Sequence, residues 1–554
     1  MSGGTIGYKV LKDLELKLDA NYTRMDIRAT ESYYDKYFNQ NANLSYKNET
    51  RFGTNYQETY NVEPQLNYKL STGNSRITAL VGGTFQQTLK GGNLVYGRNF
   101  PSEKLMLDLY SAGDVINTSS SSTYTKYKYT SFFGRLGYDY LGRYLLTATF
   151  RRDGSTRFSE DNRFGNFGAL AAGWLFSKER FVENNLRFLS YGKLRSSYGW
   201  TGNDQIADYV YMSTFAATNT YNGAAGLYAD QIGLSNFSWE TARKFEVALE
   251  LGLFNNRILF NTAYYSNISD NQLISIPLSS QTGWSSYTGN LDAKIKNSGV
   301  EIEISTDNVR RKDFRWQTNF NITFFKNKLL EYPGLEYSSY SNTYMIGKSI
   351  NLLRRYEYLG LNKDNGEPII KNQDGEGLIN SVDDYVYAGT TDNKYYGGIG
   401  NTFTWKNFDL NIFFQFVKRP TINGYLYNTN YWPVGNLYNV TKEQLENTWR
   451  KPGDDAKYPR LSAATSGPYY NLYYNQYGYS TATVVDGSFI RLKNIALSYS
   501  LPKAIVERLK LNNVRFYYMA QNLFTITNYD GYDPETGSSV PALKASTFGI
   551  NVTL

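Results

Sequence analysis

The stretch "LELKLDANYT" (residues 14–23) alternates apolar and polar side chains from end to end. Charged or amide residues stand between apolar or aromatic ones, which share one side of an extended chain: Leu14, Leu16, Leu18, Ala20 and Tyr22. Successive side chains of a β-strand point to opposite faces, so this stretch predicts a strand with one apolar and one charged face. The alternation recurs in "FEVALELGLF" (245–254), "GVEIEIS" (299–305) and "STFGINVTL" (546–554).

The composition indicates where such two-faced strands would be stable. Tyr contributes 52 of the 554 residues and aromatic residues make up 16% of the chain, yet the mean hydropathy is −0.51. Water-soluble sandwiches rarely carry so much Tyr, and a helical membrane protein would be less polar. A transmembrane barrel combines an apolar outer face, a polar inner face and aromatic girdles at both membrane interfaces. We therefore expect an all-β fold, a transmembrane antiparallel β-barrel.

Several function classes are excluded by the residues that the chain lacks. It contains no Cys and no His, which removes disulfides, Ser-His-Asp and Cys-His catalysis and the usual zinc ligands. It also lacks the run of about 18 apolar residues that a transmembrane helix needs. The net charge of +8 is spread among both signs, without the basic stripe of a nucleic-acid binder. We expect neither enzyme activity nor nucleic-acid binding.

Short and long connections alternate along the chain. Short ones include "LKDL" (11–14), "STGNS" (71–75) and "WKNFD" (405–409). The long ones are polar and rich in Gly, Asn, Ser and Tyr: 29–59, 89–128, 154–164, 201–238, 271–295, 327–396, 418–487 and 527–544. Outer-membrane barrels have short periplasmic turns and long extracellular loops, which this pattern matches. Counting a strand on each side of every short turn predicts roughly seventeen strands.

That count predicts a barrel that does not close within residues 1–554. Single-chain bacterial barrels have an even number of strands and both termini on the periplasmic side. Here the first strand leads into a short turn and the last follows a long loop, which places the two ends on opposite sides. Because an open sheet edge in lipid is costly, we expect one partial barrel domain whose first strands are missing.

Stretches along nearly the whole chain resemble the C-terminal part of SusC/RagA-type TonB-dependent outer-membrane transporters of Bacteroidetes. They follow the family's order: "GRLGYDYLGRYLLTATFRRDGSTRFSEDNRFG" (134–165), "YGKLRSSYGWTGNDQI" (191–206), "SWETARKFEVALELGLFNNRI" (238–258), "KIKNSGVEIEIS" (294–305), "SFIRLKNIALSYSLP" (488–502), "QNLFTITNYDGYDPE" (521–535) and "STFGINVTL" (546–554). The family's last residue is usually Phe, and Leu554 departs from that pattern.

The resemblance implies a complete barrel of about 22 strands with an N-terminal plug and a TonB-contacting segment. Plug, TonB box and signal peptide have no counterpart in these residues. It further implies uptake of an oligosaccharide, or less often a peptide, across the outer membrane. The implied partners are a SusD-like surface lipoprotein that closes over the external loops and TonB, which pulls on the plug.

One stretch, "NQDGEGLINSVDD" (372–384), has the spacing of a calcium-binding loop. Asn372, Asp374, Glu376 and Asp383 would provide oxygen ligands, and Gly377 would allow the sharp turn. The first ligand is Asn, the third is Glu, and the last is Asp instead of a bidentate Glu. No flanking helices are predicted. The alternative, an acidic Gly-rich surface turn, is therefore favoured, and calcium is the only cofactor that the sequence suggests.

A second stretch, "SGPYYNLYYNQYGYS" (466–480), concentrates Tyr and amide residues in a predicted external loop. Rigid aromatic rings with a polar tip give a large contact area, and amides add adaptable hydrogen bonds, a chemistry that suits sugar rings. The candidate substrate-binding residues are Tyr469, Tyr470, Tyr473, Tyr474, Asn475 and Tyr477. Contact with a protein partner and packing among the loops are the alternatives, and together they are favoured over sugar contact.

Smaller features carry structural predictions. Helices are expected within "LPKAIVERLKL" (501–511), where Pro502 would stand at the start, and within "TKEQLENTWR" (441–450). In "FRRDGSTRF" (150–158), the charges are expected to pair in the wall, with Asp153 and Gly154 opening the long loop. Trp239 is expected to anchor a strand start at the membrane interface.

The leading functional hypothesis is nutrient import through the outer membrane, with binding and guidance of a polar solute and no bond chemistry. A passive porin-like channel without a partner is the first alternative. A surface adhesion scaffold that uses its Tyr-rich loops is the second.

Overall fold

The computed structural model describes residues 2–37, 46–116, 122–221, 224–234, 236–380, 383–423, 434–435, 440, 442–537 and 540–553. The chain divides into two compact units. Unit 1 comprises Met1–Gly173, Ser197–Lys244 and Ser269–Leu291, and unit 2 comprises Trp174–Ser196, Phe245–Ile268 and Asp292–Leu554. Among the described residues, no helix is long and apolar enough to cross a membrane.

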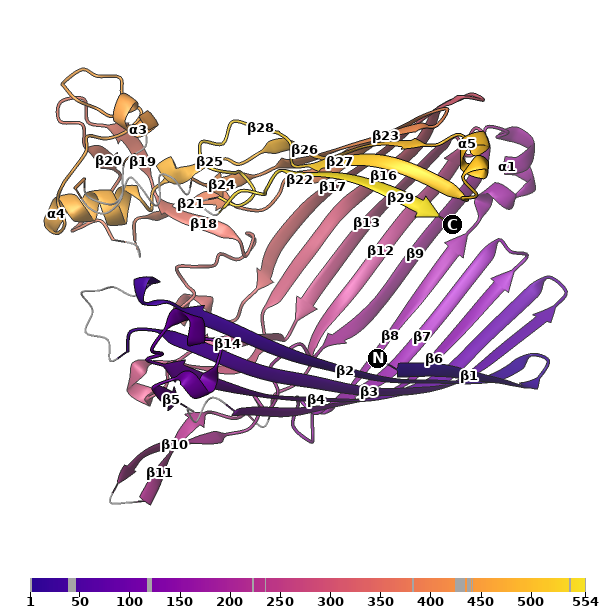
Figure 1. Cartoon of the computed structure of the whole chain (residues 1–554), viewed down its shortest axis with the longest axis horizontal. Coiled ribbons are helices and arrows are strands. Elements are labelled where there is room, and N and C mark those ends of the chain that lie inside the picture. The colour runs from indigo at the N-terminus through magenta and orange to yellow at the C-terminus, as the bar shows by residue number, and fades with distance from the viewer. Residues whose placement is uncertain are drawn as a thin grey trace. The chain divides into compact units, whose positions relative to one another are not determined.

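The main strands of unit 1 pair as antiparallel neighbours. β1 pairs with β2, β2 with β3, β3 with β4, β4 with β6, and β6 with β7. Figure 1 shows β2, β3 and β4 running side by side. The bounds are β1 Ser2–Leu11, β2 Leu14–Tyr33, β3 Glu49–Thr72, β4 Ser75–Arg98, β6 Ser122–Tyr140, β7 Tyr144–Ser155 and β8 Phe164–Trp174. Three further strands carry residues of both units: β9 Leu189–Asn203, β12 Glu240–Leu253 and β13 Ile258–Asp270.

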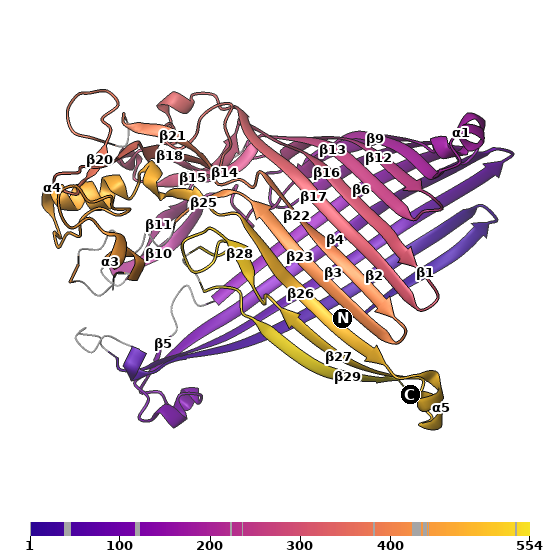
Figure 2. The same cartoon turned by 90° about the horizontal axis from the view of Figure 1, so that it is seen from above.

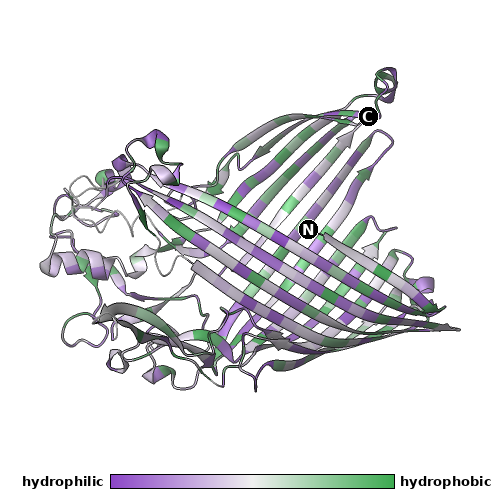
Figure 3. Cartoon of the chain, turned by 60° about the horizontal axis from the view of Figure 1, so that its bottom comes forward, coloured by the Kyte–Doolittle hydropathy of each residue, from purple (hydrophilic) through white to green (hydrophobic). Residues whose placement is uncertain are grey.

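The register of these strands separates an apolar face from a polar face. Leu16 lies opposite Tyr8 and Leu66, and Leu66 lies opposite Val81, so apolar side chains form a continuous row across the sheet. All four are exposed, which suits a surface that contacts lipid. The polar residues between them share the other face, and the alternation along the strands is visible in Figure 3. The predicted two-faced strand is confirmed.

The apolar face has sharp limits along the strands. On β3 it begins at Tyr68, near the short turn, and ends at Tyr60, whose ring lies 4.8 Å from that of Tyr22. The next pair on the same face is ionic, because the Arg24 guanidinium lies 2.6 Å from the Glu58 carboxylate. About nine to eleven residues of a tilted strand span a bilayer, and aromatic residues line both of its interfaces. Tyr68 and Tyr60 therefore mark the two edges of the membrane band.

The strands extend well beyond this band, and the predicted loops 29–59 and 89–128 were in large part wrong. β2 continues to Tyr33, β3 starts at Glu49, and β4 continues to Arg98. A run of polar residues argues against a strand only at the depth of the membrane, where one face of the strand must contact lipid. Here cross-strand pairs such as Arg24 with Glu58 stabilise a sheet that faces water on both sides.

The main strands of unit 2 repeat the antiparallel pairing. β16 pairs with β17, followed by β22, β23, β26 and β27, and β29 lies against β27 (Figure 2). The apolar row Leu410, Leu497, Tyr518 and Phe548 crosses four of them. The bounds are β16 Lys294–Arg310, β17 Phe314–Glu331, β22 Tyr395–Trp405, β23 Phe408–Lys418, β26 Phe489–Ser500, β27 Asn513–Gln521, β28 Thr525–Thr527 and β29 Ala545–Thr553.

Seventeen strands of nine or more residues occur in the described part of the chain, which agrees with the predicted count. The apolar side chains of "STFGINVTL" that the structure describes, Phe548, Ile550 and Val552, are all exposed on β29. Leu554 lies outside the described residues.

Shorter elements occupy the connections. Those of unit 1 are β5 Asp114–Ile116, β10 Thr214–Tyr221, β11 Ala224–Gln231, β14 Gln272–Pro277 and β15 Ser286–Leu291. Those of unit 2 are α1 Arg180–Asn185, β18 Leu352–Tyr356, β19 Tyr358–Leu361, β20 Pro368–Ile370, β21 Tyr385–Thr390, β24 Pro420–Ile422, β25 Val484–Asp486, α3 Lys442–Asn447, α4 Gly467–Tyr470 and α5 Lys503–Arg508. Both predicted helices are confirmed in shorter form as α3 and α5, and Pro502 caps the start of α5.

The connections of unit 1 form their own aromatic core, which corrects the prediction for Trp239. Its side chain is only 8% exposed and packs 4.8 Å from the Phe158 ring and 5.4 Å from the Phe167 ring. Its indole N–H donates to the carbonyl of Arg163 at 3.2 Å. Trp239 thus holds loop segments together and is not an interfacial anchor. From the sequence, a Trp at the start of a strand is compatible with an interfacial anchor and with a loop core. The contacts made by the folded loops distinguish the two.

The motif "FRRDGSTRF" is partly confirmed. The Arg151 Nε lies 3.2 Å from an Asp153 carboxylate oxygen, so the charges pair in the wall as expected. Asp153 and Gly154 lie opposite Ser131 and Thr130 within the β6–β7 ladder. The strand therefore continues to Ser155, and the predicted loop start at Asp153 was wrong.

Candidate functional site

The predicted site residues of both motifs lie in one group of connections in unit 2. We call residues 352–380, 383–390, 442–487 and 525–537 the loop module. Small antiparallel pairs organise it: β18 with β21 and β19 with β20. One bond joins these pairs to the Tyr-rich stretch, from the Tyr356 N–H to the Tyr479 carbonyl at 2.9 Å. A second runs from the Tyr358 N–H to the hydroxyl of Thr481, the residue that follows the stretch, at 3.1 Å.

The Tyr-rich stretch is helical, which the sequence did not predict. α4 begins after Ser466 with Pro468 in its first turn, and a π-helix follows over Asn471–Tyr477. Helical winding turns the six candidate side chains in different directions. Tyr473 and Tyr477 point inward and are buried, whereas Tyr469 is 49% exposed and Asn475 is also exposed. The structure therefore divides the predicted set into an inner and an outer group.

The inner group holds the module together. The Tyr477 side chain is 2% exposed, and its ring meets that of Tyr358 edge-on at 5.4 Å. Burial raises the pKa of Tyr473 to about 12 and raises the pKa of Tyr477 still further. Both phenols are therefore neutral at physiological pH. The prediction of self-packing, one of the alternatives, describes these two residues.

The outer group forms a surface platform. The rings of Tyr470 and Tyr474 are stacked, with centroids 5.0 Å apart and planes inclined by 14°. Next to them the Asn475 amide donates to the Asn471 side-chain oxygen at 2.8 Å. Tyr469 lies beneath a guanidinium, since the Arg460 Cζ stands 5.4 Å from its ring centroid. We call Tyr469, Tyr470, Asn471, Tyr474 and Asn475, with Arg460, the outer platform.

Arg460 connects the outer platform to a neighbouring loop. Its guanidinium donates to the Glu367 carboxylate at 2.7 Å, and its backbone N–H donates to the Gly366 carbonyl at 2.9 Å. Gly366 adopts φ +71°, and a Cβ atom there would overlap the Trp449 ring. This close approach requires glycine. The loops 357–371 and 448–460 are therefore locked together beneath the platform.

Within the module, a cationic bridge ties α3 and the loop 448–460 to the segment 525–537. The Lys457 ammonium lies 2.5 Å from the Glu443 carboxylate on α3 and 2.6 Å from the Asp530 carboxylate. Partial burial alone would lower the pKa of Lys457, but these two carboxylates hold it above its usual value. The Tyr458 hydroxyl donates to Glu443 at 3.2 Å, and burial raises the pKa of Tyr458 to about 12.

A buried ion cluster anchors that loop to the wall. Arg491 on β26 is 1% exposed, and its guanidinium lies 2.6 Å from both the Asp533 and Glu535 carboxylates. It also donates to the Thr525 hydroxyl at 2.9 Å. Burial would raise the pKa of Asp533, but the bonds from Arg491 and from backbone N–H groups hold it below its usual value. Arg491 therefore fixes the segment that carries Asp530 and, through Lys457, the platform loops.

The predicted calcium turn is closed by its own hydrogen bonds. Asn372 accepts from the Gly375 N–H at 2.7 Å, Asp374 accepts from the Glu376 N–H at 2.9 Å, and Asp383 accepts from the Asn380 amide at 3.1 Å. In the described part of the chain, no three Asp or Glu side chains gather closely enough to hold a metal ion. Calcium binding by this turn stays a prediction.

The structure adds residues that the sequence reasoning missed. Asp384, directly after the predicted ligand Asp383, is fully buried and accepts from the Gln373 N–H at 2.6 Å and the Asn380 N–H at 2.9 Å. Arg460 was missed because nothing in the sequence near 460 connects it to the Tyr-rich stretch.

Comparison with known proteins gives one consistent result. A family model described as TonB dependent receptor-like, beta-barrel matches residues 4–523. The chain is 27% identical over 545 residues to TonB-dependent receptor P3 of Formosa agariphila, covering 90% of this chain and 52% of that receptor. It is 29% identical over 569 residues to TonB-dependent receptor SusC of Bacteroides thetaiotaomicron, covering 97% and 53%.

Among solved structures, the RagAB peptide transporter matches with a TM-score of 0.86 at 25% identity, covering 100% of this chain and 61% of the matched one. The chain thus spans about half the length of the curated relatives it matches.

Proposed function

We propose, since this chain belongs to the TonB-dependent receptor-like β-barrel family, that it forms the wall and outer loops of an importer of polar solutes. The family consists of outer-membrane receptors and transporters, not enzymes, and the chain is accordingly a multi-pass β-barrel protein of the outer membrane. The resemblance noted in the sequence to SusC/RagA-type transporters is confirmed by these relatives.

The observation that carries the proposal is the two-faced wall with a platform at its long-loop end. In unit 1 the apolar band between Tyr68 and Tyr60 fits a bilayer, and the opposite face carries ion pairs such as Arg76 with Asp139 at 2.6 Å. A polar inner face lets a hydrated solute pass without meeting an apolar barrier. No covalent step is needed, so the residues bind and guide the solute.

The outer platform supports an oligosaccharide as the leading solute class. Tyr rings offer apolar faces to the C–H faces of sugar rings, and the Asn471 and Asn475 amides can exchange hydrogen bonds with hydroxyl groups. A peptide is the second class, because the matched RagAB structure is described as a peptide transporter. In both cases we propose a SusD-like lipoprotein partner over the loops and TonB as the energy source.

Uptake in the native host tests the proposal. Deleting the gene should abolish uptake of one labelled oligosaccharide or peptide from a panel, and a protonophore should stop uptake in the wild type because TonB depends on the inner-membrane proton gradient. Replacing Tyr469 and Tyr474 with Ala should raise the half-saturating concentration at least about fivefold, since two stacking contacts of about 0.5–1.5 kcal/mol each together contribute about 1 kcal/mol or more.

The control is Tyr337→Ala, because Tyr337 is 90% exposed in another loop of unit 2 and its loss should leave uptake unchanged. Uptake that persists with the protonophore would show a passive channel instead. Binding of cells to host matrix that is lost on deletion, with normal uptake of the whole panel, would show an adhesion scaffold.

A further inference from the structure

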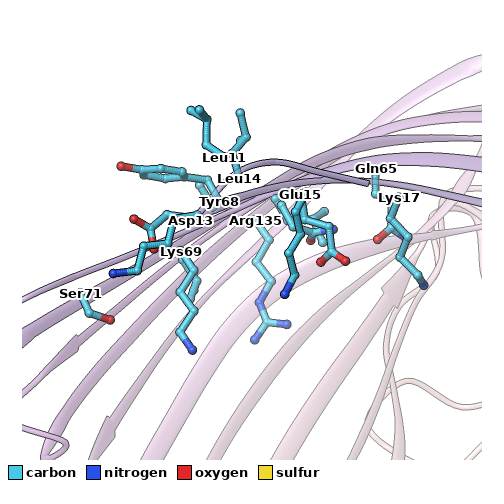
Figure 4. A pocket seen from close by; sticks show the side chains of 16 residues that line it. Leu11, Asp13, Leu14, Glu15, Lys17, Gln65, Tyr68, Lys69, Ser71 and Arg135 are labelled. Carbon is cyan, nitrogen blue, oxygen red and sulfur yellow. The ribbon is translucent and has the colours of Figure 1, made fainter. Parts of the chain in front are cut away.

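The outward-facing charges on the wall of unit 1 lie on one side of the membrane band. The register of β1, β2, β3, β4, β6 and β7 shows which of their residues share the apolar face. The charged residues on that face all lie between the band and the long loops: Arg24, Asp26, Arg28, Glu58, Lys126, Lys128 and Arg152. At the short-turn end the charges point inward. Figure 4 shows Lys69 and Arg135 directed to one side of the sheet, and Leu11 and Tyr68 to the other.

The long-loop edge of the membrane band follows the tilt of the strands. It runs from Tyr22 on β2 to Phe132 on β6, and Phe132 lies in the cross-strand row of Leu18, four residues before Tyr22. A tilt near 40° and a strand spacing of about 4.8 Å shift the membrane level by about four residues over three strand steps. The outward charges can therefore be given heights relative to this edge.

The outward cations reach beyond the headgroups of an ordinary phospholipid. Each residue past the edge adds about 2.5 Å of height, so Lys128 and Lys126 stand about 10 Å and 15 Å above Phe132. On β7, Arg152 stands about 5 Å above Phe150. The headgroup layer of a phospholipid bilayer is only about 5–7 Å thick on each side. These cations therefore face a thicker polar layer than phospholipids supply.

Most of the outward cations have no counter-ion in the described chain. Arg24 binds Glu58 at 2.6 Å and Asp26 at 2.9 Å, which uses both outward carboxylates. No carboxylate of the described residues lies within ion-pair distance of the other cations, and all of these are exposed. We call them the outer basic belt: Arg28, Lys126, Lys128 and Arg152. Because the belt lies on the lipid-facing side of the wall, a solute that follows the polar face does not meet it.

We propose that the outer basic belt binds phosphate groups of a lipopolysaccharide, the phosphorylated glycolipid of the outer leaflet. Its sugar headgroup is thicker than that of a phospholipid and carries the negative charge that the belt lacks. Arg152 can hold a phosphate with two parallel N–H donors, and Lys126 and Lys128 add adjacent point charges. Cations near a membrane surface attract anionic lipid in this way. The site is separate from the proposed import function and does not depend on it.

Binding of purified lipopolysaccharide to the full-length receptor in a neutral detergent tests the proposal. Microscale thermophoresis compares intact lipopolysaccharide, the same preparation after removal of its phosphates, and phosphatidylglycerol, each at low and high salt. We expect intact lipopolysaccharide to bind most tightly, with affinity falling as salt rises. The dephosphorylated form should bind at least about tenfold more weakly, because several cations lose their partners.

Charge variants test the belt itself. Lys126→Gln and Lys128→Gln should each weaken binding of intact lipopolysaccharide about fivefold. Asp26→Asn should strengthen it, because this variant removes a negative charge beside the belt; a purely structural residue would not give this opposite sign. The matched control is Lys90→Gln. Lys90 is exposed and lies opposite Thr125, next to the belt in height but on the polar face, so its loss should leave binding unchanged.

Three results would overturn the inference. One is equal binding of intact and dephosphorylated lipopolysaccharide. Another is binding that the belt variants leave unchanged, or that Lys90→Gln weakens as much as they do. The third is tighter binding of phosphatidylglycerol, which would assign the belt to a phospholipid. All three leave the proposed import function intact, because protonophore-sensitive uptake in cells decides that function.

Discussion

At the scale of single residues, Arg491 has the largest predicted effect on stability. Its guanidinium is buried and fully used by Asp533, Glu535 and Thr525. A buried ion pair adds little net stability compared with an apolar replacement of both partners, but removing one partner leaves the other charge buried and unpaired. The same logic does not apply to exposed pairs such as Lys442 with Glu446, which contribute little.

We therefore predict that Arg491→Leu lowers the free energy of unfolding by about 3 kcal/mol. Thermal unfolding of the purified receptor measures this change, and limited proteolysis should show early cleavage within 525–537. Arg508→Leu, at an exposed position of α5, removes the same side chain from the surface and should leave both readouts unchanged. Equal effects of the two variants would contradict the anchoring role of Arg491.

The same cluster predicts a pH dependence. The pKa of Asp533 in the folded protein is held below the ordinary value of 3.8. A carboxyl group with a lowered pKa stabilises the fold above its unfolded pKa, and this stability is lost as the pH falls through the folded value. The difference in unfolding free energy between wild type and Asp533→Asn should therefore be constant at neutral pH and shrink below pH about 4. A difference that stays constant down to the lowest pH would refute this assignment.

At the scale of elements, the loop module shows how far sequence reasoning reaches. The Tyr-rich stretch was a candidate substrate site, with partner contact and self-packing favoured as alternatives. Its pattern of Tyr and Asn gives no sign of a π-helix, so the inward turn of Tyr473 and Tyr477 could not be predicted. Strand existence, in contrast, followed directly from the period of two. The strand ends beyond the apolar band could not be predicted. Arg24 and Glu58 stabilise that part of the sheet as a cross-strand pair, but in the sequence each one is simply a charged residue in a polar segment.

The contact of Gly366 with Trp449 provides a test of how the module is held together. Gly366→Ala should destabilise the loops 357–371 and 448–460, since the new Cβ overlaps the Trp449 ring and overpacking costs about 1–3 kcal/mol. Gly334 has nearly the same backbone angle, φ +70°, with open space around it, so Gly334→Ala carries only the backbone strain. Protease susceptibility of the module should rise more in Gly366→Ala than in Gly334→Ala. Equal susceptibility would mean that the ring contact does not hold the loops.

At the scale of the whole molecule, the two-faced sheet determines where the protein can be placed. Leu18 lies near the middle of the apolar band on β2, opposite Ile6 and Pro64, while Asn21 on the same strand lies on the polar face. This assignment rests on the alternation of apolar and polar residues alone, and not on helix propensity or on a catalytic motif. Outer-membrane residence therefore follows from the pattern that the first quoted stretch already shows.

We predict that Leu18→Arg destabilises the inserted protein by about 2–4 kcal/mol, the cost of a cation at the lipid-facing midplane. Asn21→Arg introduces the same side chain on the polar face and should have little effect. Urea unfolding in lipid vesicles gives the free energies, and the heat-dependent gel shift of outer-membrane fractions gives the folded share. A larger effect at Asn21 than at Leu18 would reverse the assignment of the two faces.

The continuation of β2 past the membrane edge has a mechanical consequence. Eleven residues, Thr23–Tyr33, follow Tyr22 before the strand ends. At about 3.3 Å per residue and a tilt near 40°, they raise the rim of this hairpin about 28 Å above the lipid headgroups. A protein tethered to the bilayer by an acylated N-terminus could rest on that rim only if its leader reached the same height, which takes at least about eight fully extended residues. The length of that tether, and not its sequence, would then decide whether such a partner can reach the entrance.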